Sequence, residues 1–130
     1  MKLTLTFSDC EVASVAQEGE TVVIRLSAAH VLQTPAAEGG KPSEGFARGV
    51  VVSLTGARIE GPVGHLIGHV SQGRVCSGGR WSSAAKLPST GAGPVELELT
   101  FANQSGLTLS GSHIHFGFDG AANFAESLFC

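Results

Sequence analysis

Glycine and proline occur along the whole chain, and this distribution restricts what the chain can fold into. The 130 residues include 18 glycines and five prolines, and both residue types interrupt helices. Elsewhere apolar and polar residues alternate with a period of two, as in residues 2–7 and 95–101. This period places alternate side chains on one face of a β-strand. The sequence therefore predicts strands joined by tight turns, with little or no helix.

The predicted strands define a fold class. Further strands are expected at about residues 10–16, 21–32 and 46–54, and the first two of these form a hairpin. Eight or nine short antiparallel strands with frequent turns are typical of a β-sandwich or a flattened barrel. The length suits one domain spanning residues 1–130. Within it, residues 34–45 are poor in apolar side chains and are predicted to form a mobile surface loop.

A hairpin near the C-terminus has the clearest pattern. Residues 103–106, Asn-Gln-Ser-Gly, suit a turn that is closed by Gly106 in the left-handed conformation. With such a turn, we expect Phe101 opposite Leu107 and Leu99 opposite Leu109. Both pairs then face the core.

The alternation changes phase beyond Gly111. Ile114, Phe116 and Phe118 occupy even positions, whereas the preceding apolar residues occupy odd ones. Burying each large apolar side chain contributes roughly 1.5–3 kcal/mol, so the strand should adjust its phase to bury these three. A β-bulge at residues 111–112 would achieve this with one extra residue.

Composition excludes several classes of function. Charged residues make up 15% of the chain and the net charge is −3, with basic residues scattered singly. Nucleic-acid binding requires a clustered basic face, and a membrane-spanning helix requires roughly 18 consecutive apolar residues; neither pattern is present in the sequence. The N-terminal residues alternate and lack the apolar core of a signal peptide. Cys10, Cys76 and Cys130 are an odd, widely spaced set, which predicts reduced thiols in a cytoplasmic protein.

Histidines are the residues most able to bind a metal or transfer a proton. His113 and His115 lie two apart, so a strand would place both rings on one face, roughly 6–7 Å apart. They are the candidate metal ligands. His65 and His69 would lie roughly 13 Å apart on a regular strand, too far to share one metal. His30 has the phase of the core-facing residues of its strand, which predicts a buried, hydrogen-bonded imidazole.

One further window combines several reactive groups. Cys76, Arg80 and Trp81 fall within six residues that also include two glycines. A cysteine nucleophile requires a nearby base and an electropositive setting. A turn between two strands, with Trp81 packed as a lid on the core edge, explains the same residues without catalysis.

By elimination, the sequence points to a non-catalytic β-sheet module without a cofactor. Titratable residues are dispersed, whereas low charge, edge strands and a late group of phenylalanines suit association. The group comprises Phe116, Phe118, Phe124 and Phe129. The expected partner is a second copy of the chain, as in a homodimer, or another protein. The alternative is a β-barrel that binds a small ligand or a metal in a histidine-lined site. The two hypotheses differ in whether histidines from separate strands converge.

Overall fold

The alternating segments form strands throughout the computed structural model. It describes residues 2–34, 40–59 and 67–126, with side chains described for residues 3–34, 40–59 and 67–119. No helix occurs in these ranges, and every strand pairing is antiparallel. The strands are β1 (Lys2–Thr6), β2 (Glu11–Glu18), β3 (Thr21–Thr34), β4 (Ser43–Thr55), β5 (Gly68–Ser77), β6 (Arg80–Ser82), β7 (Ala84–Leu87), β8 (Ser89–Phe101) and β9 (Gly106–Glu126).

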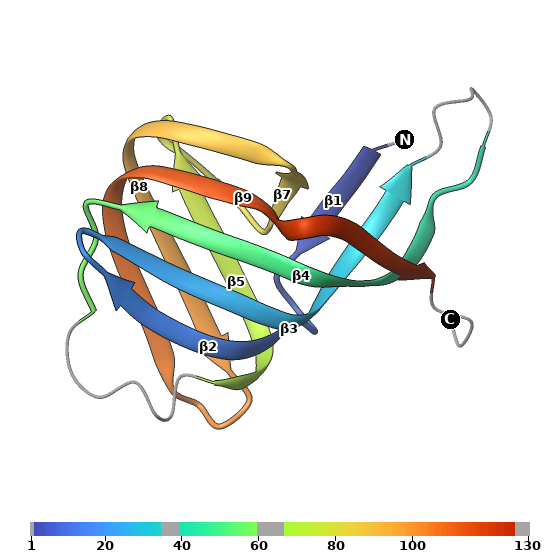
Figure 1. Cartoon of the computed structure of the whole chain (residues 1–130), viewed down its shortest axis with the longest axis horizontal. Helices are drawn as coiled ribbons and strands as arrows, with labels where there is room; N and C mark the ends of the chain where they lie inside the picture. Colours follow the sequence, from blue (N-terminus) through green and yellow to red (C-terminus); the bar gives the residue numbers. More distant parts are fainter. Residues whose placement is uncertain (1, 35–39, 60–66, 127–130) are drawn as a thin grey trace.

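Six strands close into a barrel, which confirms the predicted all-β fold (Figure 1). The order around the barrel is β2-β5-β8-β9-β4-β3, and pairing between β2 and β3 closes it. Several strands are longer than the sequence predicted, since β3 has 14 residues and β9 has 21.

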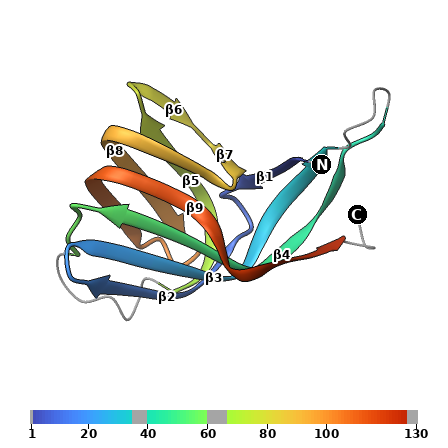
Figure 2. The same ribbon diagram turned by 45° about the horizontal axis from the view of Figure 1, so that its top comes forward.

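These long strands continue beyond the barrel into an open sheet (Figures 1 and 2). We call this sheet the wing; it comprises β1, β7 and residues 29–34, 43–48 and 119–126 of β3, β4 and β9. The order across the wing is β9-β4-β3-β1-β7. β9 therefore forms one border of the wing and β7 forms the other.

The buried face of β3 changes where the strand passes from the barrel to the wing. Leu26 is buried in the barrel, whereas Ala29 and Val31 are the buried residues of the wing segment. The partner strand β4 bends at the same level, where Gly49 has a φ of 75°. The prediction that His30 shares the core-facing phase was therefore wrong. His30 lies on the opposite face from Val31 and is half-buried.

The C-terminal hairpin has a different register from the predicted one. Leu99 pairs with Leu107 rather than Leu109, a shift of two residues. The shift arises because Gln104, with a φ of 72°, takes the left-handed conformation that we expected of Gly106. Since side chains alternate with a period of two, the shift leaves the leucines on the core face.

The predicted phase change on β9 is confirmed. Ile114 and Phe116 are buried, and His113 and His115 are exposed. Phe118 is half-buried and packs against the same core. Phe116 is therefore a core residue and cannot belong to an associating aromatic surface, whereas Phe124 and Phe129 lie outside the described side chains.

The extra residue that accompanies this change lies on the partner strand. β8 has two residues, Gly93 and Pro94, between the pairs formed by Ala92 and Val95, where β9 has Ser112 alone. Gly93 has a φ of 82°, which favours glycine. The bulge thus occurs at the predicted level but on β8 instead of β9.

The segment predicted as a loop at residues 34–45 is shorter in the structure. β3 continues through Thr34 and β4 begins at Ser43, where it pairs with Gln33. Residues 35–39 lie outside the described part of the chain.

The barrel interior is filled with apolar side chains. Within the described residues no polar or charged residue is buried. The void between Phe7, Cys10 and the aliphatic residues around them measures about 10 Å³, which is at the lower limit for a single water molecule. Within the described residues, the outer face and the strand edges are therefore the candidate surfaces for contact with ligands or partners.

Candidate functional site

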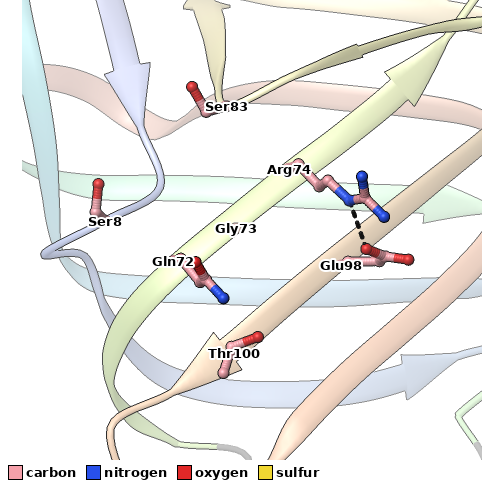
Figure 3. A pocket seen from close by; sticks show the side chains of 7 residues that line it. All are labelled: Ser8, Gln72, Gly73, Arg74, Ser83, Glu98 and Thr100. Carbon is pink, nitrogen blue, oxygen red and sulfur yellow. Dashed lines mark hydrogen bonds and ion pairs between the residues drawn. The ribbon is translucent and has the colours of Figure 1, made fainter.

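A polar groove lies on the outer face of the barrel over β5 (Figure 3). Its volume is about 470 Å³. Two strands supply one side of it, and the segments that follow β1 and β6 supply the other. The lining residues are Ser8, Gln72, Gly73, Arg74, Ser83, Glu98 and Thr100.

The pairing of β5 with β8 explains why the polar side chains gather there. Gln72 is opposite Thr100 and Arg74 is opposite Glu98, and all four are on outward-facing positions. Gly73 lies between them, and its missing side chain would point inward: an added Cβ would lie 2.7 Å from Leu99 Cδ2. The alternation of β5 therefore provides a polar outer face and a tightly packed inner one.

Arg74 is held at two points. Its Nε donates a hydrogen bond to Glu98 Oε2 at 2.6 Å, which raises the pKa of the guanidinium above its usual value. The guanidinium carbon lies 4.0 Å from the centre of the Trp81 ring, which is a cation–π contact. Arg74 thus stays charged, and Glu98 compensates its charge.

Four other side chains of the groove are available to a ligand. Within the described residues, the side chains of Ser8, Gln72, Ser83 and Thr100 form no hydrogen bond. Each can both donate and accept hydrogen bonds. The groove therefore presents unused hydrogen-bonding groups around a compensated ion pair.

The predicted reactive window forms the β5–β6 hairpin. Cys76 pairs with Trp81 across a turn at Gly78 and Gly79, as the turn interpretation predicted. Trp81 is 40% exposed and covers Arg74, so its predicted role as a lid on the core edge was wrong. Arg80 lines a different hollow of about 230 Å³ with Ser77 and Ser82 among its neighbours.

The two described cysteines are free thiols in different environments. Cys76 is half-buried and, within the described residues, forms no hydrogen bond with a histidine; its proposed nucleophilic role stays a prediction. Cys10 is buried, and desolvation raises the pKa of its thiol to about 11. Its Sγ donates a hydrogen bond to the Thr6 carbonyl oxygen at 3.0 Å. Cys10 is therefore a structural residue.

His30 connects three strands of the wing. Its Nδ1 lies 2.5 Å from Thr6 Oγ1, and its Nε2 is paired with the Glu44 carboxylate. A neutral ring satisfies both contacts when Nε2 donates to Glu44 and Nδ1 accepts from Thr6. The prediction of a hydrogen-bonded imidazole is confirmed. The hydroxyl–imidazole–carboxylate order resembles that of a nucleophile and its base, but none of the described grooves includes these residues.

His113 and His115 lie on the outer face of β9, where their backbones pair with β4 and β8. The His115 ring occupies the space beside Gly117, since an added Cβ there would lie 2.5 Å from its Cε1. In the described ranges, no group of three or more His, Cys, Asp or Glu side chains could hold a metal ion. His69 is 3.3 Å from an oxygen of Asp9, and His65 falls outside those ranges. The metal site at His113 and His115 thus stays a prediction.

Comparisons with known proteins do not identify a relative. No family model matches the chain, and no curated protein or solved structure shows significant similarity to it. Within the described residues, no helix is long and apolar enough to span a bilayer.

Sequence reasoning missed the groove. Neither Arg74 nor Glu98 is among the candidate residues that the sequence indicates. The polar side chains at positions 72 and 74 indicate an outward face of a strand. Only the pairing of β5 with β8 shows that polar side chains of a second strand lie beside them. The contribution of Ser8 and Ser83 depends on where two loops pass over β5, which no local pattern indicates.

Proposed function

We propose that the chain is a non-catalytic β-sheet module that forms a homodimer through the open edge of β9. This edge comprises residues 118–126. β8 pairs with β9 only as far as Phe116, so within the described residues the edge has β4 on one side and no strand on the other. The C-terminal half of β9 lies along the border of the wing (Figure 2). This open border carries the proposal.

The two borders of the wing differ in how they are protected. β7 has four residues, includes Lys86 and is followed by Pro88. Short length, lysine and proline are the usual means by which proteins block edge-to-edge pairing. Residues 118–126 contain neither lysine nor proline. The contrast indicates that β9 is the border suited to receive another strand.

One of the two acidic residues at this edge has its charge compensated. Asp119 is paired with Arg25 at 2.7 Å, so the carboxylate is not an isolated charge facing a second copy. A two-fold axis would place the same edge of both copies antiparallel, which satisfies backbone groups on each side. About ten backbone hydrogen bonds at roughly 1 kcal/mol each must offset an association cost of about 4–15 kcal/mol. We therefore expect a weak dimer.

The test is sedimentation velocity over a concentration series that reaches about 1 mM. A dissociation constant of about 1 mM corresponds to a binding free energy of only about −4 kcal/mol, so the series detects even a weak dimer. Two variants, Ala121→Lys and Ala122→Lys, each introduce a lysine on the edge, and successive residues cover both faces of the strand. The matched control is Thr55→Lys, an exposed position of β4 that has β3 on one side and β9 on the other. It adds the same charge away from the edge.

We expect the wild type and Thr55→Lys to dimerise with increasing concentration, and both edge variants to remain monomeric. A wild-type chain that is monomeric throughout the series would refute the proposal. Equal dimerisation of the edge variants would show that another surface is used. If the wild type is monomeric alone but a different protein protects the edge amides from hydrogen exchange, the module binds that protein instead of itself.

A cytoplasmic location is part of this proposal. Cys10 and Cys76 are free thiols, and thiols persist in reducing compartments. Cell fractionation of the tagged full chain would test it, and recovery outside the cytoplasm would contradict it.

A further inference from the structure

The polar groove over β5 selects for a particular ligand chemistry. Its side chains offer hydroxyls, an amide and an ion pair, and no apolar side chain is among the residues that line it. A volume of about 470 Å³ lies within the usual range for small-ligand sites. The ligand should therefore be small and polar, with many hydrogen-bonding groups.

The ion pair argues for a neutral ligand. Arg74 Nε and Glu98 Oε2 are 2.6 Å apart, and both residues line the groove. An anion that approaches the guanidinium also meets the carboxylate, and a cation meets the guanidinium in the same way. Such like-charge contacts disfavour either ligand. A neutral ligand can instead accept from Arg74 and donate to Glu98 at once.

Hydroxyl groups match the remaining side chains better than a peptide does. Each hydroxyl of a ligand can donate and accept, as can Ser8, Gln72, Ser83 and Thr100. An extended peptide needs pockets for alternate side chains to be recognised, and this groove has no apolar pocket of that kind in its lining. Trp81, which is 40% exposed, adds an aromatic surface behind Arg74. A tryptophan side chain has an apolar ring and a polar N–H group, so it suits a ligand that presents both apolar C–H and polar groups.

From these observations we infer that the groove over β5 binds a neutral carbohydrate, one or two sugar rings in size, through Gln72, Arg74, Glu98 and Thr100. The inference does not depend on the proposed dimer, because no residue of the β9 edge lines the groove. In the ion pair, Arg74 supplies a charged hydrogen-bond donor and Glu98 a charged acceptor. The hydroxyls and the amide that form no hydrogen bond with the described residues lie around this pair.

The full chain carries its own reporter for this site. Trp81 is the single tryptophan and there is no tyrosine, so intrinsic fluorescence arises next to Arg74. Titrations with maltose, cellobiose, lactose and N,N′-diacetylchitobiose, all neutral disaccharides, should extend to about 10 mM, because an open polar groove is expected to bind with a Kd on the order of 1 mM. Amide chemical shifts of residues 72–74 and 98–100 provide a second measurement.

The decisive comparison uses the same substitution at two neighbouring positions. Thr100→Val removes a groove hydroxyl, whereas Thr108→Val removes one from an outward position of β9 that is opposite Glu98 and outside the groove. We expect at least one sugar to bind saturably, about fivefold more weakly to Thr100→Val and equally well to Thr108→Val. Gln72→Ala should weaken binding to a similar extent.

Three results would overturn the inference. The first is no saturable change with any of the four sugars at about 10 mM, the range set by the expected affinity. The second is unchanged binding in both Thr100→Val and Gln72→Ala. The third is tighter binding of acetyl-trialanine amide than of every sugar, which would assign the groove to a peptide. Dimerisation is measured separately, so its failure and the failure of sugar binding remain distinguishable.

Discussion

Replacing Gly73 by alanine should destabilise the barrel directly beneath the groove. An ideal Cβ at this position would lie 2.7 Å from Leu99 Cδ2, 2.8 Å from Phe7 Cβ and 3.1 Å from the Glu98 carbonyl oxygen. Leu99 and Phe7 are 5% and 3% exposed, so neither can move without disturbing the core. The contact with Phe7 involves a Cβ atom, which is fixed to the backbone.

The magnitude follows from overpacking. Inserting a methyl group into a well-packed core typically costs about 1–3 kcal/mol. For a chain of this length, 1 kcal/mol corresponds to about 3–5 °C in Tm, between the values for smaller and larger domains. We therefore expect Gly73→Ala to lower Tm by about 3–15 °C, the range that these two relations give.

Gly106→Ala is the matched control. Gly106 also lies in a strand, and an added Cβ would lie 3.6 Å from the nearest atom, an ordinary contact. Since alanine restricts the unfolded chain more than glycine does, this variant should be neutral or gain up to about 1 kcal/mol. Urea denaturation with an unchanged m value and calorimetry measure both variants. Equal stability of Gly73→Ala and wild type, or equal loss in the two variants, would refute the packing argument.

Two further predictions concern the wing and its buried thiol. Thr6→Val removes the hydroxyl beside His30 Nδ1 and should lower the free energy of unfolding, measured by urea denaturation, by about 1 kcal/mol. The control is Thr4→Val, on the same face of β1, which should have little effect. Equal losses in the two variants would contradict the role of His30. Because burial raises the pKa of Cys10 to about 11 from a usual value of 9, its thiol keeps a proton that the unfolded chain loses above pH 9. Its contribution to stability is therefore complete below about pH 9 and falls by about 2–3 kcal/mol as the pH rises to 11. The difference in unfolding free energy between wild type and Cys10→Ala should shrink over this interval, and a constant difference would contradict it.

Local pattern predicted much of the fold, because side-chain alternation and turn residues act over a few positions. The phase change before Ile114 could be found from the strand alone, since burial of Ile114 and Phe116 outweighs a regular ladder. The side of the bulge could not be found, because the two residues opposite Ser112, Gly93 and Pro94, lie on the partner strand. The hairpin register failed for a similar reason: Gln104 took the left-handed position that composition assigns to glycine.

Features that depend on distant strands could not be predicted. His30 changes face because β3 and β4 bend together between the barrel and the wing, and one strand's sequence does not record that bend. The groove requires β5 to pair with β8 and two loops to pass nearby. Closure of the barrel by β2 and β3 depends on a local hairpin, but the order of the other strands is set by long-range packing.

The filled interior determines where a barrel of this kind can act. Barrels that hold a ligand inside need a cavity, whereas the described void in this core measures about 10 Å³. Within the described part of the chain, the outer surface then has two chemically different features: an edge along residues 118–126 with a paired strand on one side only, and a groove in which four polar side chains form no hydrogen bond. Backbone groups at an edge are satisfied by another strand, and clustered hydroxyl and amide groups are satisfied by a polar ligand. Because the two sites share no residue, a homodimer could present two grooves, so an edge variant that abolishes dimerisation should leave the affinity of each groove for a sugar unchanged.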